Sequence, residues 1–211
     1  VDIPLDYKKL SEAKKNLYIS QSFKVALDLI KKSNSYALIN GPVSKATFLK
    51  GKFRGITEYL ASKTESLNEV MLIFNKKLSV SPITTHVPIN KITKQIKRKT
   101  IINKIENIDK FYKKFLGLKP NIAVTGLNPH CETFSGKNIE KIEILPAINF
   151  LKKKRIKVSG PFSADTIFLK RNRKKFDVIV GMYHDQVLGP MKTIFGFDAI
   201  NITIGLPFIR I

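Results

Sequence analysis

The chain has 211 residues, of which 43% are hydrophobic, and this length is enough to bury a core as one large domain or two small ones. No apolar run approaches the roughly 20 residues that cross a bilayer, and no signal peptide is visible. The single cysteine, Cys131, excludes an internal disulfide. Together these features predict a folded cytoplasmic protein.

The formal net charge of +22 allows two interpretations. A strongly basic chain can attract nucleic acid or an anionic membrane surface. Here the lysines and arginines are spread along the whole chain, and their clusters at 152–155 and 171–175 lie between apolar strands. No nucleic-acid-binding module is recognisable. We therefore expect a lysine-rich solvated surface that draws in an anionic substrate, with nucleic-acid binding as the alternative.

The first half of the chain alternates between helical and strand patterns. Apolar residues at helical spacing predict one or two helices over 8–33, and a short apolar run predicts a strand over 36–40. A turn at Gly41-Pro42 then leads to a helix over 44–51. Further elements are predicted in this order: a helix over 55–65, strands over 69–74 and 77–86 joined at Asn75-Lys76, and a long amphipathic helix over 91–116.

The second half continues the alternation. It predicts strands and helices at 121–128, 138–154, 155–162 and 177–183, and then, after a short link, an apolar run over 199–209. This order indicates the α/β class, with a largely parallel sheet that carries one antiparallel pair. The G-x-G-x-x-G nucleotide fingerprint does not follow any predicted strand. Residues 1–211 form one continuous α/β unit in this prediction, with no internal boundary assigned.

All three histidines follow predicted strands: His86, His130 and His184. In a parallel sheet such strand exits lie along one edge, so the three imidazoles can converge. Imidazole suits divalent zinc, nickel, cobalt or iron, and three protein ligands leave a position open for substrate. The sequence therefore predicts a metal site at this edge. For any one of them, the alternative is an ordinary surface or core histidine.

Further polar side chains accompany the histidines. Asp165 and Asp185 also follow strands, where they can orient imidazoles or contact a substrate ammonium group, and helix N-capping is the alternative. Lys192, Asn201 and Arg210 suit a phosphate or a carboxylate. Cys131, beside His130, is either a ligand or a buried thiol.

Seven segments together resemble the 4-hydroxythreonine-4-phosphate dehydrogenase family of pyridoxine (vitamin B6) biosynthesis. In chain order they are GPVSKATFLKG, GITEYL, TTHVPI, TGLNPHCE, GPFSADTIF, MYHDQVLGPMK and NITIGLPFIR, and they extend from about residue 36 to the end. The resemblance implies a homodimer with a two-domain α/β/α sandwich fold similar to isocitrate and isopropylmalate dehydrogenases. The segment GITEYL departs from the family at Ile56, where the family usually has histidine, and NPHCE replaces the commoner NPHAGE.

The resemblance also implies a set of site residues. The family's divalent metal (zinc, magnesium or cobalt) would be held by His86, His130 and His184 and shared across the dimer interface. We assign catalytic roles to Asp165, Asp185 and Lys192. The family's substrate contacts match Thr57, Lys192, Asn201 and Arg210.

The implied reaction is the oxidation of 4-phosphooxy-L-threonine by NAD or NADP, followed by decarboxylation. Two alternatives stay open. One is a family member that acts on a threonate or erythronate 4-phosphate. The other is an inactive relative that keeps the dimer and the metal site.

Overall fold

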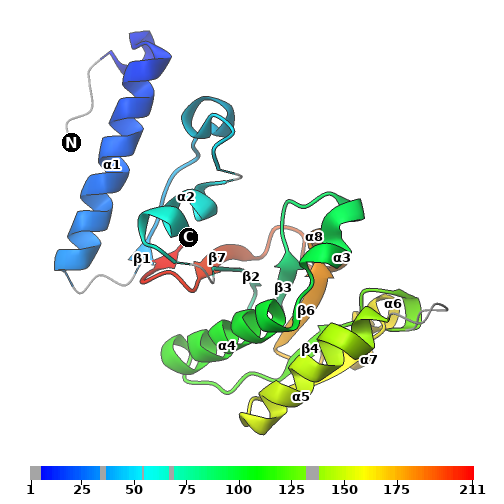
Figure 1. Cartoon of the computed structure of the whole chain (residues 1–211). Helices are drawn as coiled ribbons and strands as arrows, with labels where there is room; N and C mark the ends of the chain where they lie inside the picture. The colour runs from blue at the N-terminus through cyan, green and yellow to red at the C-terminus, as the bar shows by residue number, and fades with distance from the viewer. Residues whose placement is uncertain (1–5, 34–36, 54, 67–68, 132–137) are drawn as a thin grey trace. The chain divides into compact units, whose positions relative to one another are not determined.

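The computed structural model describes residues 6–33, 37–53, 55–66, 69–131 and 138–211 (Figure 1). The chain divides into two compact units, Val1–Leu67 with Gly205–Ile211, and Asn68–Ile204. The boundary that the sequence left unassigned therefore falls after Leu67 and again after Ile204. We describe each unit by itself.

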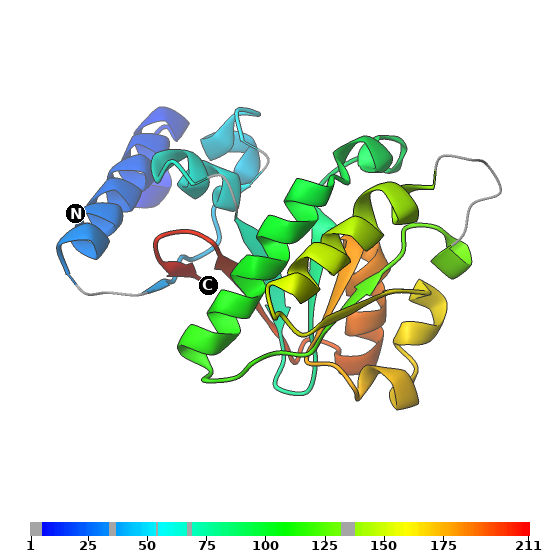
Figure 2. The same cartoon turned by 60° about the horizontal axis from the view of Figure 1, so that its bottom comes forward.

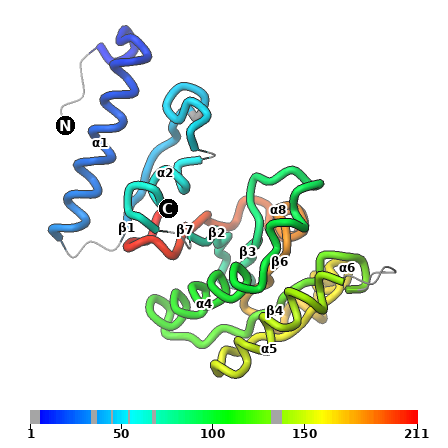
Figure 3. The backbone as a smooth tube through the Cα atoms, in the orientation of Figure 1, coloured from blue at the N-terminus to red at the C-terminus, as the bar shows by residue number. Residues whose placement is uncertain are grey.

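The first unit consists of helices around a two-stranded parallel pair. Strand β1 (Ala37–Leu38) pairs with β8 (Ile209–Arg210), so the end of the chain lies beside a segment near its beginning (Figure 3). The other elements are the 3₁₀ turn Tyr7–Lys9, helix α1 (Glu12–Lys32), the π-helical turn Lys45–Leu49 and helix α2 (Ile56–Lys63). The helix predicted over 44–51 is thus a single short turn, and Ser44 makes no capping hydrogen bond.

The second unit is built on a mixed sheet of order β7-β2-β3-β6-β4-β5. Its strands are β2 (Val70–Phe74), β3 (Ser79–Thr84), β4 (Ile122–Thr125), β5 (Val158–Phe162), β6 (Val178–Tyr183) and β7 (Ile200–Ile204). Strand β2 is antiparallel to both β3 and β7, and the remaining pairings are parallel. The predicted α/β class with a largely parallel sheet is confirmed, with two antiparallel pairings instead of one.

Helices cover both faces of this sheet. Figure 2 shows α4 (Arg98–Phe115) and α5 (Leu145–Lys153) on one face and α8 (His184–Phe195) on the other. The shorter elements are Ile89–Lys91, α3 (Ile92–Gln95), Pro129–Cys131, Glu140–Ile144, α6 (Ala164–Ile167) and α7 (Lys170–Arg173). None of the helices in the described ranges combines the length and the apolar character that crossing a bilayer requires.

Two element predictions in this unit were wrong. The helix predicted over 91–116 is interrupted at Ile96 and Lys97, which have extended backbones, and Ile96 is completely buried. The short link predicted after residue 183 is helix α8, although Pro190 lies inside it. The helix packs closely on β6, since a Cβ at Gly181 would lie 2.4 Å from Val187 Cγ1.

Tyr112 of α4 gives the second unit a pH-dependent contribution to stability. Its hydroxyl donates a hydrogen bond to Ser79 Oγ on β3 at 2.8 Å, and burial raises the pKa of Tyr112 from 10.0 to about 12. The unfolded chain releases this proton at lower pH than the folded chain. The stabilisation is therefore complete below about pH 10 and is lost as the pH rises towards 12.

We expect Tyr112→Phe to remove this alkaline sensitivity. Two pKa units correspond to about 3 kcal/mol, so the wild-type chain should lose about 2–3 kcal/mol more of its unfolding free energy than the variant between pH 9 and pH 12. Denaturant titrations at both pH values measure the difference, and lysine ionisation cancels because both proteins share it. Equal losses in the two proteins would contradict the role of Tyr112.

Candidate active site at the strand ends

The three histidines follow three adjacent parallel strands of the second unit. His86 comes two residues after β3, His184 directly follows β6, and His130 lies in a turn after β4. Since β6 pairs in parallel with both β3 and β4, their carboxyl ends share one edge of the sheet. The strand exits that precede the three histidines therefore share one edge, whereas the convergence of the three imidazoles stays a prediction. Such an edge is where open α/β sheets bind ligands.

His86 and His184 lie close together. Their ring centroids are 6.1 Å apart, and the two ring planes are inclined by 35°. His184 Nδ1 lies 2.9 Å from Asp185 Oδ1, which is hydrogen-bond distance. When Nδ1 carries the proton for this bond, the lone pair of the ring is on Nε2, where a metal or a proton can bind. This contact is compatible with the predicted role of Asp185 in orienting the imidazole, which stays a prediction.

His130 lies in a turn with unusual backbone geometry and has Asp165 nearby. His130 and Cys131 both have positive φ, at 55° and 60°. The neighbouring Ser163 hydroxyl holds the pKa of Asp165 below its usual value, and the charge of protonated His130 acts in the same direction. Among the described residues, Ser163 Oγ has no partner in good hydrogen-bond geometry, so we interpret its effect on Asp165 as that of a nearby hydroxyl dipole. Neither Asp165 nor Asp185 is a helix N-cap, because Ser163 and Tyr183 occupy those positions.

The described residues do not assemble the three histidines around one point. Within the described ranges, no three His, Cys, Asp or Glu side chains come close enough to hold one ion. The chemistry of the donors fits a divalent metal, and the separation of His86 and His184 suits two of its ligands. His130 is not in position to be the third. The metal triad therefore stays a prediction.

Lys192 and Asn201 do not lie at strand ends. Lys192 is exposed in the last turn of α8, and the eight residues from His184 correspond to about 12 Å of helix. Asn201 is exposed within β7, opposite Ile73 of β2. Their predicted roles as substrate contacts, and the catalytic role of Lys192, stay predictions.

Thr57 and Arg210 belong to the first unit. Thr57 lies in the first turn of α2, where it is half-buried. Arg210 Nε donates a hydrogen bond of 2.8 Å to Asn40 Oδ1, and this bond fixes the guanidinium next to the turn after β1. Burial lowers the pKa of Arg210 from its ordinary value. Arginine nevertheless keeps its charge in proteins, so it remains suited to an anion.

Ile56, which replaces the histidine usual in the resembling family, is a core residue in this chain. It is 7% exposed and belongs to a buried cluster with Phe23, Tyr59 and Leu60. We expect Ile56→His to lower the free energy of unfolding by about 1–3 kcal/mol, because an imidazole would enter an apolar environment. The exposed Lys63→His change in the same helix serves as the matched control. Equal urea midpoints for the two variants would contradict the core role of Ile56.

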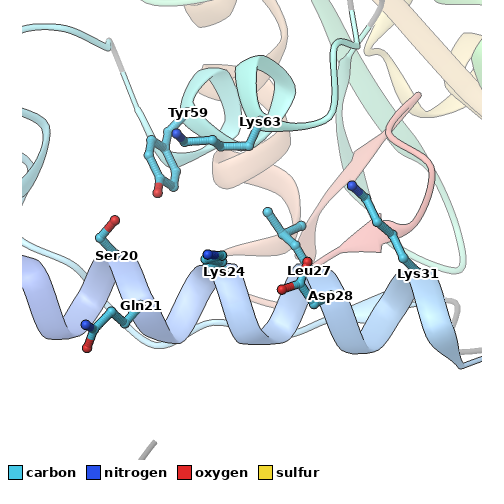
Figure 4. Close-up of a pocket in the computed structure, with 8 residues that line it drawn as sticks. All are labelled: Ser20, Gln21, Lys24, Leu27, Asp28, Lys31, Tyr59 and Lys63. Atoms are coloured by element: carbon cyan, nitrogen blue, oxygen red, sulfur yellow. The ribbon is translucent and has the colours of Figure 1, made fainter.

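A separate pocket of about 320 Å³ lies between α1 and α2 in the first unit (Figure 4). Tyr59 and Lys63 of α2 face side chains of α1 across it. Its remaining lining residues are Ser20, Gln21, Lys24, Leu27, Asp28 and Lys31. The pocket contains none of the residues predicted for the site, and its lysines are exposed to solvent.

Gln186 is a site residue whose role the sequence did not show. Its side chain is 8% exposed and links the ends of two strands. The amide oxygen accepts hydrogen bonds from Met182 N at 2.7 Å and Thr125 Oγ1 at 3.0 Å, and the amide nitrogen donates to Gly126 O at 2.8 Å. Gln186 therefore holds the start of α8 against the exits of β4 and β6. The only signal in the sequence is its place directly after the His-Asp pair.

The sheet is that of an α/β protein, and its three histidines follow the carboxyl ends of adjacent parallel strands. The family described as "Pyridoxal phosphate biosynthetic protein PdxA" matches the whole chain, residues 1–211, and the chain belongs to this family. The resemblance inferred from the seven segments is confirmed.

Individual relatives agree with this assignment. A 4-hydroxythreonine-4-phosphate dehydrogenase of Sulfurihydrogenibium sp. (strain YO3AOP1) is 41% identical over 92% of this chain and 60% of its own length. A D-threonate 4-phosphate dehydrogenase of Pectobacterium atrosepticum is 35% identical, over 83% of this chain and 55% of its own length.

A solved structure of the family also matches. The crystal structure of 4-hydroxythreonine-4-phosphate dehydrogenase from Klebsiella pneumoniae has a TM-score of 0.86 and 32% identity to this chain. The match covers 100% of this chain and 67% of that one. The chain thus spans 55% to 67% of the length of these relatives.

Proposed function

We propose that this chain belongs to an oxidoreductase that oxidises 4-phosphooxy-L-threonine (4-hydroxythreonine 4-phosphate) in vitamin B6 biosynthesis. The observation that carries the proposal is the position of His86, His130 and His184 after three adjacent parallel strands, within segments typical of the family. The names of the relatives support the substrate and the type of reaction.

In the proposed reaction, a hydride leaves C3 of the substrate for NAD or NADP, and the hydroxyl proton passes to Asp165 or Asp185. The resulting 3-oxo acid then loses its carboxylate as carbon dioxide, and C2 of the enolate that remains takes up the proton held by the aspartate. A bound divalent metal would polarise the hydroxyl oxygen and stabilise the negative charge that develops there. His86 and His184 are its proposed ligands, and Asp185 keeps the second imidazole in the metal-binding tautomer.

In this proposal the cationic and amide side chains bind the anionic groups of the substrate. Arg210 suits a phosphate or carboxylate by its two-pronged geometry, and Lys192 acts as a point charge. Thr57 and Asn201 complete the proposed substrate contacts. Because Lys192 lies about 12 Å of helix from His184 in the same chain, we propose that two copies of the chain share each site. His130 of the other copy would then supply the third metal ligand.

A second candidate substrate is D-threonate 4-phosphate. Two observations favour it: a relative with that name is 35% identical to the chain, and Ile56 is buried where the family usually has a histidine. An erythronate 4-phosphate has the same chemical groups, so we include it in this second candidate.

Turnover assays with protein from the complete reading frame test these proposals. Reduction of NAD and NADP is followed with 4-phosphooxy-L-threonine, D-threonate 4-phosphate and D-erythronate 4-phosphate, after reconstitution with zinc, magnesium or cobalt. The highest kcat/KM should occur with 4-phosphooxy-L-threonine and should depend on the metal. A preference for one of the sugar-acid phosphates would assign the second candidate. Bound metal without turnover of any substrate would identify an inactive relative.

A further inference from the structure

Glu140 is a buried carboxylate outside every residue predicted for the site. Its exposure is 2%, and it opens the helical turn that precedes α5. Oε1 accepts hydrogen bonds from the backbone nitrogens of Leu127 and Asn128, both at 2.9 Å. The side-chain amide of Asn128 lies 3.2 Å from each carboxylate oxygen. A buried carboxylate with three N–H donors forms charge-assisted hydrogen bonds, which are the strong kind.

The backbone that Glu140 binds leads directly to His130. Asn128 O accepts a hydrogen bond from Cys131 N at 3.1 Å, and this bond closes the four-residue turn in which His130 lies. His130 and Cys131 both have the positive φ that side chains with a Cβ rarely adopt. Such a conformation persists only where its surroundings hold it in place. Glu140 holds the first half of the turn, and the strained second half carries the imidazole.

We propose that Glu140 is a positioning residue for His130, which it serves through Asn128 and the 128–131 turn. This inference rests on the proposed metal-dependent function. Outer partners of this kind typically change metal affinity or activity by about 10–100-fold when they are removed.

The same helical turn offers a matched control. Glu143 accepts a hydrogen bond from the backbone nitrogen of Arg98 at 2.6 Å and lies 3.6 Å from Lys97 Nζ. Glu143 therefore fixes the backbone at the start of α4, as Glu140 fixes the backbone that leads into the 128–131 turn. A purely structural role for the carboxylates of this helical turn would make Glu140→Gln and Glu143→Gln equivalent.

The test compares Glu140→Ala, Glu140→Gln and Glu143→Gln in two measurements. The first is the imidazole NMR spectrum without metal, in which three histidines give three ring signals. We expect Glu140→Ala to shift or broaden the His130 signal alone and Glu143→Gln to leave it unchanged. The second is cobalt affinity, which should weaken about 10–100-fold in Glu140→Ala. Glu140→Gln, which keeps an acceptor oxygen, should lie between wild type and Glu140→Ala.

The outcomes separate this inference from the proposed function. If the wild-type protein takes up no metal, the proposed function fails, whereas the His130 signal still decides the role of Glu140. An unchanged His130 signal in Glu140→Ala, or equal changes in all three histidines, would overturn the inference. If Glu140→Ala does not fold, the comparison of Glu140→Gln with Glu143→Gln decides in its place. A His130 shift no larger in the first than in the second would then refute the positioning role.

Discussion

Replacing His184 with alanine is expected to lower turnover of the proposed dehydrogenase reaction about a thousandfold. The change removes an imidazole that lies 6.1 Å from the ring of His86, between centroids. A metal supplies several kcal/mol of transition-state stabilisation, and each 1.4 kcal/mol corresponds to a factor of ten in rate. Metal content and kcat/KM of the reconstituted protein measure the effect. The fold should be unaffected, because His184 lies at the edge of the sheet and not in its core.

A graded control accompanies this change. Asp185 is 85% exposed at its side chain, and its observed contact with the site is the hydrogen bond to His184 Nδ1. Asp185→Asn should therefore lower kcat/KM by about 10–100-fold, less than His184→Ala does. Metal content should stay near the wild-type value in Asp185→Asn and fall in His184→Ala. A His184→Ala protein that keeps both stoichiometric metal and most of its turnover would refute the ligand role.

The sequence predicted those parts of the fold that depend on local patterns. The apolar run over 177–183 became β6, five of whose six residues are buried, because a strand covered on both faces is apolar throughout. The histidines could be placed at strand exits because the strands before them also appear in the sequence as apolar runs. Their common edge then followed from the parallel pairing of β6 with its two neighbours.

The features that the sequence missed depend on tertiary contacts. Gly189 and Pro190 are typical of a turn, yet α8 continues through them because its apolar face packs on β3 and β6. The break at Ile96 and Lys97 is likewise stabilised from outside, by Glu143 binding the nitrogen of Arg98. Such partners lie tens of residues away in the sequence, so periodicity gives no sign of them.

The buried polar network behind the histidines was hidden for a related reason. A glutamine or glutamate in the sequence is normally taken as a surface residue, since these types are rarely buried without a partner. Gln186 and Glu140 are buried because they form hydrogen bonds with backbone groups at or near the ends of β4 and β6. The sequence shows which side chains can react, whereas the structure shows which side chains hold them.

Replacing Gln186 with leucine should have the largest effect on stability among the changes considered, about 3–5 kcal/mol. Leucine is similar in size but leaves Met182 N, Gly126 O and Thr125 Oγ1 without the partners they have now. Each buried group that loses its partner costs about 1–3 kcal/mol. The exposed Gln95→Leu change in α3 is the matched control and should stay within about 0.5 kcal/mol of wild type.

The same substitution tests whether the network serves the site as well as the fold. Gln186 contacts the strand exits that precede His130 and His184, so its loss should disturb both imidazoles. Urea denaturation gives the stability change, and the histidine ring signals of the folded variant report on the site. We expect the ring signals of His130 and His184 to shift more than the signal of His86. The reason is that β3, the strand before His86, takes part in none of the Gln186 hydrogen bonds. A variant as stable as Gln95→Leu would show that water replaces the amide and that the network is not what holds α8 in place.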